Sequence, residues 1–212
     1  MKKFITAAFF VMFTVSQASA EVGVNVGISG NAGLFAASAK EVADETHKGS
    51  EHGEAAWPSI FIEKTLGDRF AIGVDYVPAA LETDTVETSK QDKDGSATAT
   101  SRTNTVQIDF EDLTTVYVAL NVTDNMYIKA GIVTVDVITN EKLETGSTYG
   151  NTDLDGTQFG FGINNEFGNG MFIRAEGSYM TFDGASLSSN DNKITLSNLD
   201  GLSGKLAIGK SF

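Results

Sequence analysis

Five charged residues lie in the middle of segments that otherwise alternate apolar and small residues. They are Asp75, Lys129, Arg174, Glu176 and Lys205. Charges that leave water for a narrow interior must pair with opposite charges, because pairing offsets the cost of desolvation. We therefore interpret these five residues as a charge network that lines a lumen. Two roles are open for it: a structural set of salt bridges that fills the interior, or a gate on a small ion pathway.

A second group that could do chemistry is the pair of histidines, His47 and His52, which lie among acidic residues in the segment 40–54. Histidine and carboxylate ligands suit a divalent metal, but an acidic segment of this kind is also typical of a solvated loop. Acyl transfer or hydrolysis needs a nucleophile, a base and an orienting group in one place. Both histidines fall in this one segment, so we expect no catalytic residues, no metal site, no cofactor and no enzymatic activity.

The composition excludes several classes of protein. The chain has 212 residues, no cysteine and a formal net charge of −13. Without cysteine there is neither a disulfide framework nor a cysteine-ligated zinc or iron–sulfur centre. An acidic chain also lacks the basic surface that binds phosphates, so we expect no nucleic-acid partner.

The first twenty residues have the layout of a secretory signal peptide. Lys2 and Lys3 precede an apolar run, and Ala18-Ser19-Ala20 matches a cleavage site. The apolar run is too short for a membrane-spanning helix, which needs about 20 such residues. We expect residues 1–20 to be cleaved and residues 21–212 to form one mature domain.

The remainder of the chain alternates with a period of two, as strands do. Residues 22–29, for example, place valine and isoleucine on one face and glycine, asparagine and serine on the other. Eight strands are predicted in this way, over approximately residues 22–37, 55–64, 70–76, 106–120, 126–138, 159–164, 171–182 and 202–212. The second strand leaves open which of its faces is apolar. The fourth strand is expected to keep its even-numbered apolar residues, from Val106 to Leu120, on one face.

The connections between these strands alternate in length. Three are short turns with glycine, aspartate or asparagine, at residues 66–69, 122–125 and 168–170. Four are long polar segments, at residues 40–54, 81–102, 140–156 and 183–198. Short periplasmic turns, long outer loops and an even number of strands are typical of transmembrane barrels. The sequence therefore predicts an all-β fold, an eight-stranded antiparallel up-and-down transmembrane β-barrel.

A soluble β-sandwich or lipocalin-type barrel shows the same alternation, with the apolar face inside. Charges in the middle of strands, alternating loop lengths and a terminal aromatic residue, Phe212, favour the transmembrane barrel instead. We therefore expect an integral protein of the outer membrane. Trp57, at the outer end of the second strand, is expected to lie in an aromatic girdle at the membrane interface.

Four segments resemble the OmpA/OmpX-like family of small outer-membrane β-barrels. These are residues 70–76, 122–131, 174–176 and 201–212. The resemblance implies that Lys129 and the Arg174–Glu176 pair point into the lumen. It also implies that Phe212 is the signal that the barrel-assembly machinery reads.

Together these observations predict a barrel with a structural, adhesive or surface-interaction role and at most slight passive ion permeation. A small-solute porin or channel is the alternative, and a lipid-modifying enzyme is a weaker one. The expected partners are outer-membrane lipid and lipopolysaccharide, the assembly machinery during biogenesis, and divalent cations if the acidic loops bind them. We expect a monomer.

Overall fold

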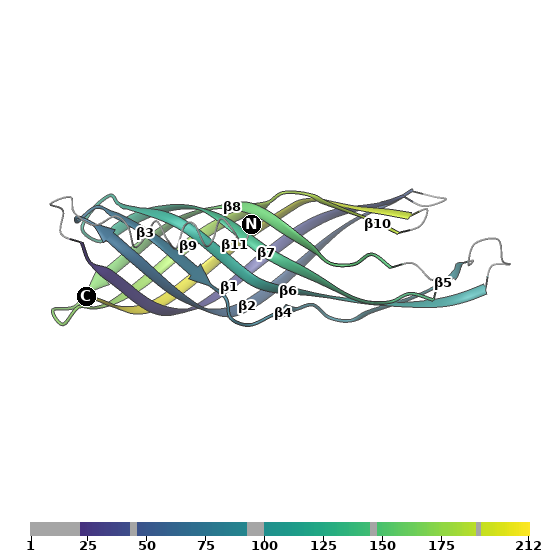
Figure 1. Ribbon diagram of the computed structural model, residues 1–212, viewed down its shortest axis with the longest axis horizontal. Coiled ribbons are helices and arrows are strands. Elements are labelled where there is room, and N and C mark those ends of the chain that lie inside the picture. The colour runs from purple at the N-terminus through teal and green to yellow at the C-terminus, as the bar shows by residue number, and fades with distance from the viewer. Residues whose placement is uncertain (1–21, 43–45, 93–99, 145–147, 190–191) are drawn as a thin grey trace.

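Eight strands form a closed antiparallel ring in the computed structural model, which describes residues 22–42, 46–92, 100–144, 148–189 and 192–212 (Figure 1). The ring strands are β1 (Val24–Val42), β2 (Thr46–Leu66), β3 (Phe70–Tyr76), β6 (Thr100–Asn121), β7 (Met126–Lys142), β8 (Thr152–Glu166), β9 (Met171–Phe182) and β11 (Asn192–Ser211). Each strand pairs with the next one around the ring, and β1 pairs with β11 to close it. The predicted eight-stranded up-and-down barrel is confirmed. The expected signal peptide lies outside the described residues.

Within the described ranges, three further strands extend the ring at its outer end. The short β4 (Leu81–Glu82) and β5 (Val86–Asp92) both pair with β6, and β10 (Ala185–Ser189) pairs with β11. No helix within the described ranges is long and apolar enough to cross a membrane.

The three short turns lie together at the end of the barrel where the described chain begins and ends (Figure 1). Gly67 and Gly170 adopt φ values of 64° and 79° in two of these turns, a region that L side chains rarely enter. Phe212 joins this end to β1: its backbone N–H donates to the Val24 carbonyl at 2.9 Å, and it accepts from the Val24 N–H at 3.1 Å. The polar turn sequences thus set strand order and register.

The outer wall of the ring is apolar. Directly paired residues on neighbouring strands share a face, and the apolar members of these pairs point outward. Side chains that are at least 60% exposed on this wall include Ile28, Leu34, Ile132, Phe159, Leu202 and Leu206. The opposite residues of the same strands, such as Asn25 and Ser29, are buried inside. The prediction that the apolar face is outside is confirmed, because a soluble barrel would have the reverse arrangement.

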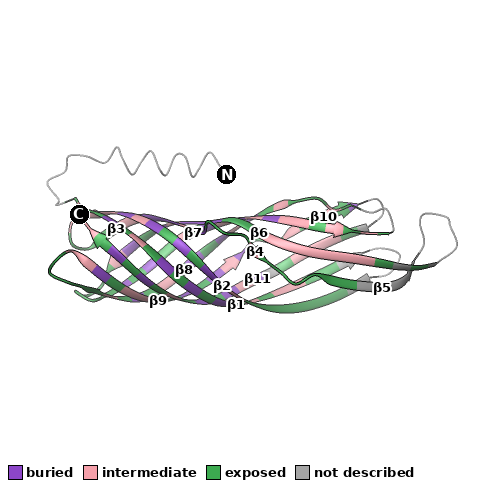
Figure 2. Cartoon of the chain, turned by 90° about the horizontal axis from the view of Figure 1, so that it is seen from below, coloured by how far each residue is buried: buried purple, intermediate pink, exposed green. Residues whose placement is uncertain are grey.

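The strands are much longer than a membrane requires. β1 has 19 residues and β6 has 22; at about 3.3 Å per residue β1 is roughly 60 Å long. With a tilt of about 40° it rises about 45 Å, whereas the apolar band of such a barrel is about 25 Å tall. The expectation that the four long connections are loops is therefore wrong in extent, because much of each connection continues as strand. Figure 2 shows buried residues concentrated near the turns and mostly exposed or half-buried residues on the extensions.

A β-bulge in β6 corrects one facing prediction. The register between β6 and β7 shifts between Glu111 and Thr114, and Asp112 adopts φ 53° in the bulge. A bulge inserts one residue, so it exchanges the two faces of the strand. Ile108 therefore packs against the interior cluster, whereas Val118, which has the same parity, is 47% exposed on the outer wall.

Candidate functional site

Among the described residues, three ion pairs cross the interior in the half of the barrel nearest the turns. Lys129 on β7 pairs with Glu176 on β9, and Lys205 on β11 pairs with Asp75 on β3. The third pair joins Arg174 Nη1 on β9 to Glu63 Oε1 on β2 at 2.5 Å. The structure thus places all five residues that sequence analysis assigned to the lumen inside the barrel and in ion pairs. Glu63 is a sixth member that sequence analysis missed.

Glu63 is the most enclosed member of this network, with a side chain only 2% exposed. Tyr117 Oη donates to its Oε1 at 2.8 Å, and Asn25 Nδ2 donates to its Oε2 at 3.0 Å. Together with Arg174, these groups give both carboxylate oxygens a partner. The buried carboxylate thus has an opposite charge and two further hydrogen-bond donors as neighbours, which offsets its loss of water.

Glu176 is held in a similar way. Tyr127 Oη donates to its Oε2 at 2.8 Å, and Lys129 Nζ donates to its other oxygen. Both side chains of the Lys129–Glu176 pair are 3% exposed. Each buried charge in the two deepest pairs therefore has an opposite charge and a hydrogen bond, which is the condition for burying charge at tolerable cost.

Aromatic rings enclose the guanidinium of Arg174. Its Cζ atom lies 4.5 Å from the ring centroid of Phe172, 5.5 Å from that of Tyr127 and 5.7 Å from that of Phe61. Phe61 and Phe172 are both buried and form a small apolar cluster with Ala207. The interior is thus closed by packed rings as well as by charge.

Glycines on the inner wall make room for the two tyrosines. A Cβ atom on Gly73 would lie 2.5 Å from Tyr117 Cζ, and a Cβ on Gly162 would lie 2.5 Å from Tyr127 Cζ. Real Cβ atoms do not approach other atoms so closely, so each tyrosine ring fills the space that a neighbouring side chain would occupy. The inward-facing glycines therefore leave room for the tyrosine rings, while the large apolar residues that alternate with them face the lipid.

Above the ion pairs lies a layer of uncharged polar residues. Ser29 and Ser59 share a hydrogen bond of 2.6 Å, and Ser178 and Ser203 share one of 2.9 Å. Gln158 Nε2 donates to Ser178 Oγ at 3.2 Å, while the buried Oε1 atom of Gln158 is without a hydrogen-bond partner among the described residues. This layer separates the charged zone from an apolar one.

The outer half of the interior is apolar, which the sequence analysis did not predict. Its buried residues form one cluster: Trp57, Val77, Leu113, Val133, Val135, Val137, Leu154, Met180, Phe182 and Leu199. Val133 is completely inaccessible, and Leu154 and Met180 are each 2% exposed. These side chains come from odd positions on β7 and even positions on β8 and β9, so they face inward. Within the described residues, these side chains pack against one another as an apolar core.

Trp57 belongs to this cluster, so its expected place in an interfacial girdle is wrong. The residue is 6% exposed and its ring centroid lies 5.8 Å from that of Phe35. Its neighbours Ala56 and Pro58 face outward instead. The sequence left the facing of this strand ambiguous because apolar residues fall on both faces, Ile60 and Ile62 on one and Phe61 on the other.

The histidine segment forms part of a strand. His52 lies in β2 and is exposed, and His47 lies in the same strand. Across the described residues, no group of three or more histidine, cysteine, aspartate or glutamate side chains is placed to hold a metal ion.

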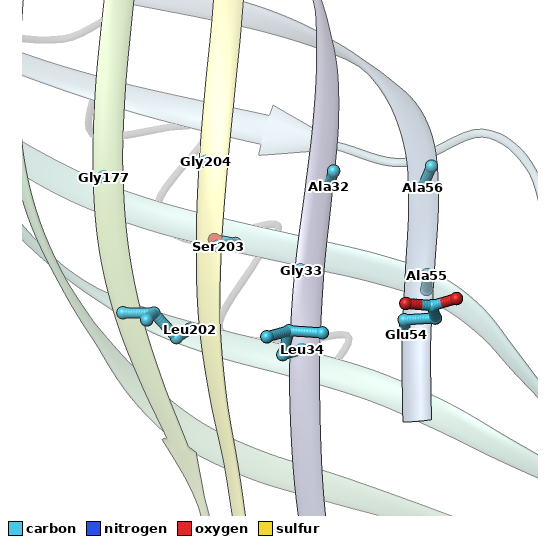
Figure 3. A pocket seen from close by; sticks show the side chains of 10 residues that line it. All are labelled: Ala32, Gly33, Leu34, Glu54, Ala55, Ala56, Gly177, Leu202, Ser203 and Gly204. Atoms are coloured by element: carbon cyan, nitrogen blue, oxygen red, sulfur yellow. The ribbon is translucent and has the colours of Figure 1, made fainter. Parts of the chain in front are cut away.

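A shallow depression lies on the lipid-facing wall (Figure 3). Ala56, Ala32, Gly204 and Gly177 are consecutive partners across β2, β1, β11 and β9. Leu34 and Leu202 border this row of small residues on one side. The depression exists because four neighbouring strands carry almost no side chain at one level.

Comparisons with known proteins support the fold. No family model matches the chain, and neither does any curated protein. Among solved structures, the chain is similar to the outer membrane protein OprG from Pseudomonas aeruginosa, with a TM-score of 0.56, 12% identity, and coverage of 91% of this chain and 97% of OprG. It is less similar to AlkL (TM-score 0.47, 10% identity, 94% and 95% covered) and to Ail of Yersinia pestis (0.37, 10%, 89% and 98%).

The resemblance to OprG bears on the fold alone, and the surfaces of the barrel give the location. A closed antiparallel ring with an apolar wall outside and charged residues inside is the architecture of outer-membrane barrels. Its exposed isoleucine, leucine and phenylalanine side chains would be unfavourable in water. The chain is an integral outer-membrane β-barrel protein.

Proposed function

We propose that this protein is a non-enzymatic, plugged barrel that anchors its outer β-extensions at the cell surface, where they make contacts with other molecules. The observation that carries the proposal is the closed interior: three ion pairs span the lumen and an apolar cluster fills the half above them. Passive permeation of ions through such an interior would be slight at most.

The plug favours a structural role for the charges over a gate. An open aqueous channel would leave lumen charges hydrated, whereas Glu63, Lys129 and Glu176 have side chains only 2–3% exposed. An eight-stranded ring is just wide enough for side chains to fill. A hydrated ion would have to break at least one buried pair to pass, at a cost of several kcal/mol.

The extensions supply the surface for interactions. They rise about 20 Å beyond the apolar band, by the strand length and tilt given above. Within the described residues the extensions carry hydroxyl pairs on their surface, such as Ser38 with Ser50 and Ser89 with Thr103. A rigid anchor with long, strand-built extensions fits adhesion or surface interaction better than catalysis.

The resemblance of four strand segments to OmpA/OmpX-like barrels supports the same proposal. It extends the proposal to lipopolysaccharide as the surrounding lipid, to a monomeric state, and to Phe212 as the residue read during assembly. Phe212 is 73% exposed at the turn end of the barrel, where another protein can reach it.

A second candidate is a route for small apolar molecules, favoured by the apolar side chains that fill the outer half and that would have to move apart for a molecule to enter. A brominated alkane that enters this zone should quench the emission of Trp57, which is the single tryptophan of the chain. Quenching that saturates with the alkane concentration would support this second function. Quenching in simple proportion to the alkane content of the membrane would oppose it.

Conductance tests the first proposal. The refolded protein, with folding verified by a shift in gel mobility between unheated and boiled samples, is added to a planar lipid bilayer. The proposal predicts rare, small and unstable current steps. Stable steps on the nanosiemens scale would overturn it and make a porin the better interpretation.

A further inference from the structure

We propose that the free outer edge of β2 binds a basic, extended peptide segment of a partner protein by strand addition. The inference rests on the proposed surface-interaction function and names the class of partner. It follows from the pairing of the strands, the charges along the edge and the side chains behind it.

The edge arises because β2 is paired on both sides over only part of its length. β2 pairs with β1 from Thr46 to Lys64, but with β3 only from Ile60 to Leu66. Within the described residues, positions 46–59 therefore have a strand on one side only. An unpaired strand edge presents a row of backbone N–H and C=O groups, which is a template for an added strand; on β2 this row of donors ends before Pro58, which has no N–H.

A second free edge borders the same opening. Within the described ranges β4 and β5 pair with β6 alone, so their other edge has no partner strand. Figure 1 shows the extension formed by β5 and β6 diverging from the extension that carries β10. On the opposite side of the rim the two parts are joined, because Thr148 N–H donates to Ser189 Oγ at 2.7 Å and Asp183 N–H donates to the Asp155 carbonyl at 2.7 Å. The ring is thus open on the β2 side.

Both edges of the opening are acidic. Five exposed carboxylate residues follow the two edges in the described residues: Glu51, Glu54, Glu82, Asp84 and Glu87. The exposed cation among the same described side chains is Lys48. A strand that carries positive charges is attracted to such an edge, whereas an acidic strand is repelled.

The side chains along β2 also specify an alternating partner. The inward-facing residues beside the opening are Glu51, Gly53 and Ala55, and this row ends at the ring of Trp57. Apolar side chains of an added strand would fit over the small residues Gly53 and Ala55, and a basic one would fit beside Glu51. Glu54 faces outward with Leu34 (Figure 3), and would meet the partner's outward side chains. The edge therefore favours a strand that alternates basic and apolar residues.

A second copy of this chain is a poorer occupant. Two copies in one membrane are related by an axis along the membrane normal, so their β2 strands run in the same direction and cannot pair in antiparallel fashion. Their acidic edges would also repel each other. A peptide from outside the membrane has neither restriction.

The test uses the mature protein folded in nanodiscs of uncharged lipid, and a fluorescently labelled peptide of alternating lysine and valine. Fluorescence anisotropy should show saturable binding. Two control peptides keep one feature each: a fully N-methylated version keeps the charge but cannot donate backbone hydrogen bonds, and a glutamate–valine version keeps the backbone but reverses the charge. We expect both controls to bind at least about tenfold more weakly.

Two protein variants locate the site. E51Q/E54Q removes two carboxylates from the β2 edge and should weaken binding about five- to tenfold, since exposed charge pairs contribute up to about 1 kcal/mol each. D136N/D153N is the matched control, because Asp136 and Asp153 are paired acidic residues on β7 and β8, away from this edge. It should leave binding unchanged.

Four results would overturn the inference: no saturable binding of the lysine–valine peptide, equal binding of the N-methylated peptide, equal binding of the glutamate–valine peptide, or equal weakening by both variants. Conductance measured on the same preparation separates this failure from failure of the proposed function. Absent peptide binding with no stable conductance overturns the strand-addition inference alone, whereas stable conductance overturns the plugged barrel.

Discussion

The Glu63–Arg174 pair should contribute more to stability than the more exposed Asp75–Lys205 pair. Replacing Glu63 by alanine leaves Arg174 in an interior where its side chain is only 14% exposed. It also removes the acceptor of Tyr117 Oη and of Asn25 Nδ2, at 2.8 and 3.0 Å. Breaking a buried ion pair costs about 3–5 kcal/mol, because one charge stays behind without compensation.

This loss is large relative to the total free energy of unfolding. Folded domains are stable by about 5–15 kcal/mol, so Glu63→Ala can prevent folding outright. Glu63→Gln is the second variant, since it keeps the shape and one acceptor oxygen and should lose less than the alanine variant. Asp75→Asn is the matched comparison, because the Asp75–Lys205 pair is more exposed, at 11% and 12%, and should lose less than Glu63→Gln.

The assay is urea-induced unfolding of the protein in lipid vesicles, followed by the gel-mobility shift of the folded barrel. The double variant E63M/R174M removes both charges and should be within about 1–2 kcal/mol of the parent, because no buried charge is left unpaired. A loss below about 1 kcal/mol in Glu63→Gln, or a double variant less stable than Glu63→Gln, would contradict the stabilising role of the buried pair.

Three further predictions concern packing and backbone. Gly73→Ala should abolish the folded band on unheated gels, because its new Cβ would lie 2.5 Å from the enclosed Tyr117 ring. Gly177→Ala should fold normally, because its new Cβ would have nothing within 4 Å. Loss of the folded band in both variants would contradict the packing argument. Asp112→Val should lower the urea midpoint by the equivalent of about 1–2 kcal/mol because φ is 53° there, whereas glycine at this position should be tolerated. Trp57 should resist both aqueous acrylamide and brominated lipid, since it lies inside the barrel; strong quenching by brominated lipid would return it to the membrane interface.

The sequence predicted the strands best where the apolar and small residues alternate without interruption. β8 and β9 are such cases: Phe159, Phe161 and Ile173 face outward as expected. The terminal strand β11 behaves similarly, because glycine, serine and lysine alternate there with leucine and isoleucine. In these strands one face is so different from the other that a one-residue shift would expose every polar residue to lipid.

Three features were beyond the reach of alternation. The bulge at Asp112 inserts one residue, and the apolar residues on either side of it have the same parity in sequence. The outer extensions are polar on both faces, so nothing in their residues separates a strand from a loop. Glu63 was missed because the second strand offered no clear apolar face; its position two residues after Phe61 on the face of Ser59 was the available signal.

The apolar face of the barrel points to lipid, and the interior is filled; spin labels can test both statements in one strand. Because the chain has no cysteine, single cysteines can be placed in turn along residues 171–182 of β9 and spin-labelled. Collisions with oxygen report lipid, and collisions with a water-soluble nickel complex report water. We predict high oxygen accessibility at 173, 175, 177 and 179, and protection from both reagents at 172, 178, 180 and 182, the inward positions that carry no charge. Access of the nickel complex to the second set would contradict a filled interior, and the reverse pattern would contradict the membrane barrel itself.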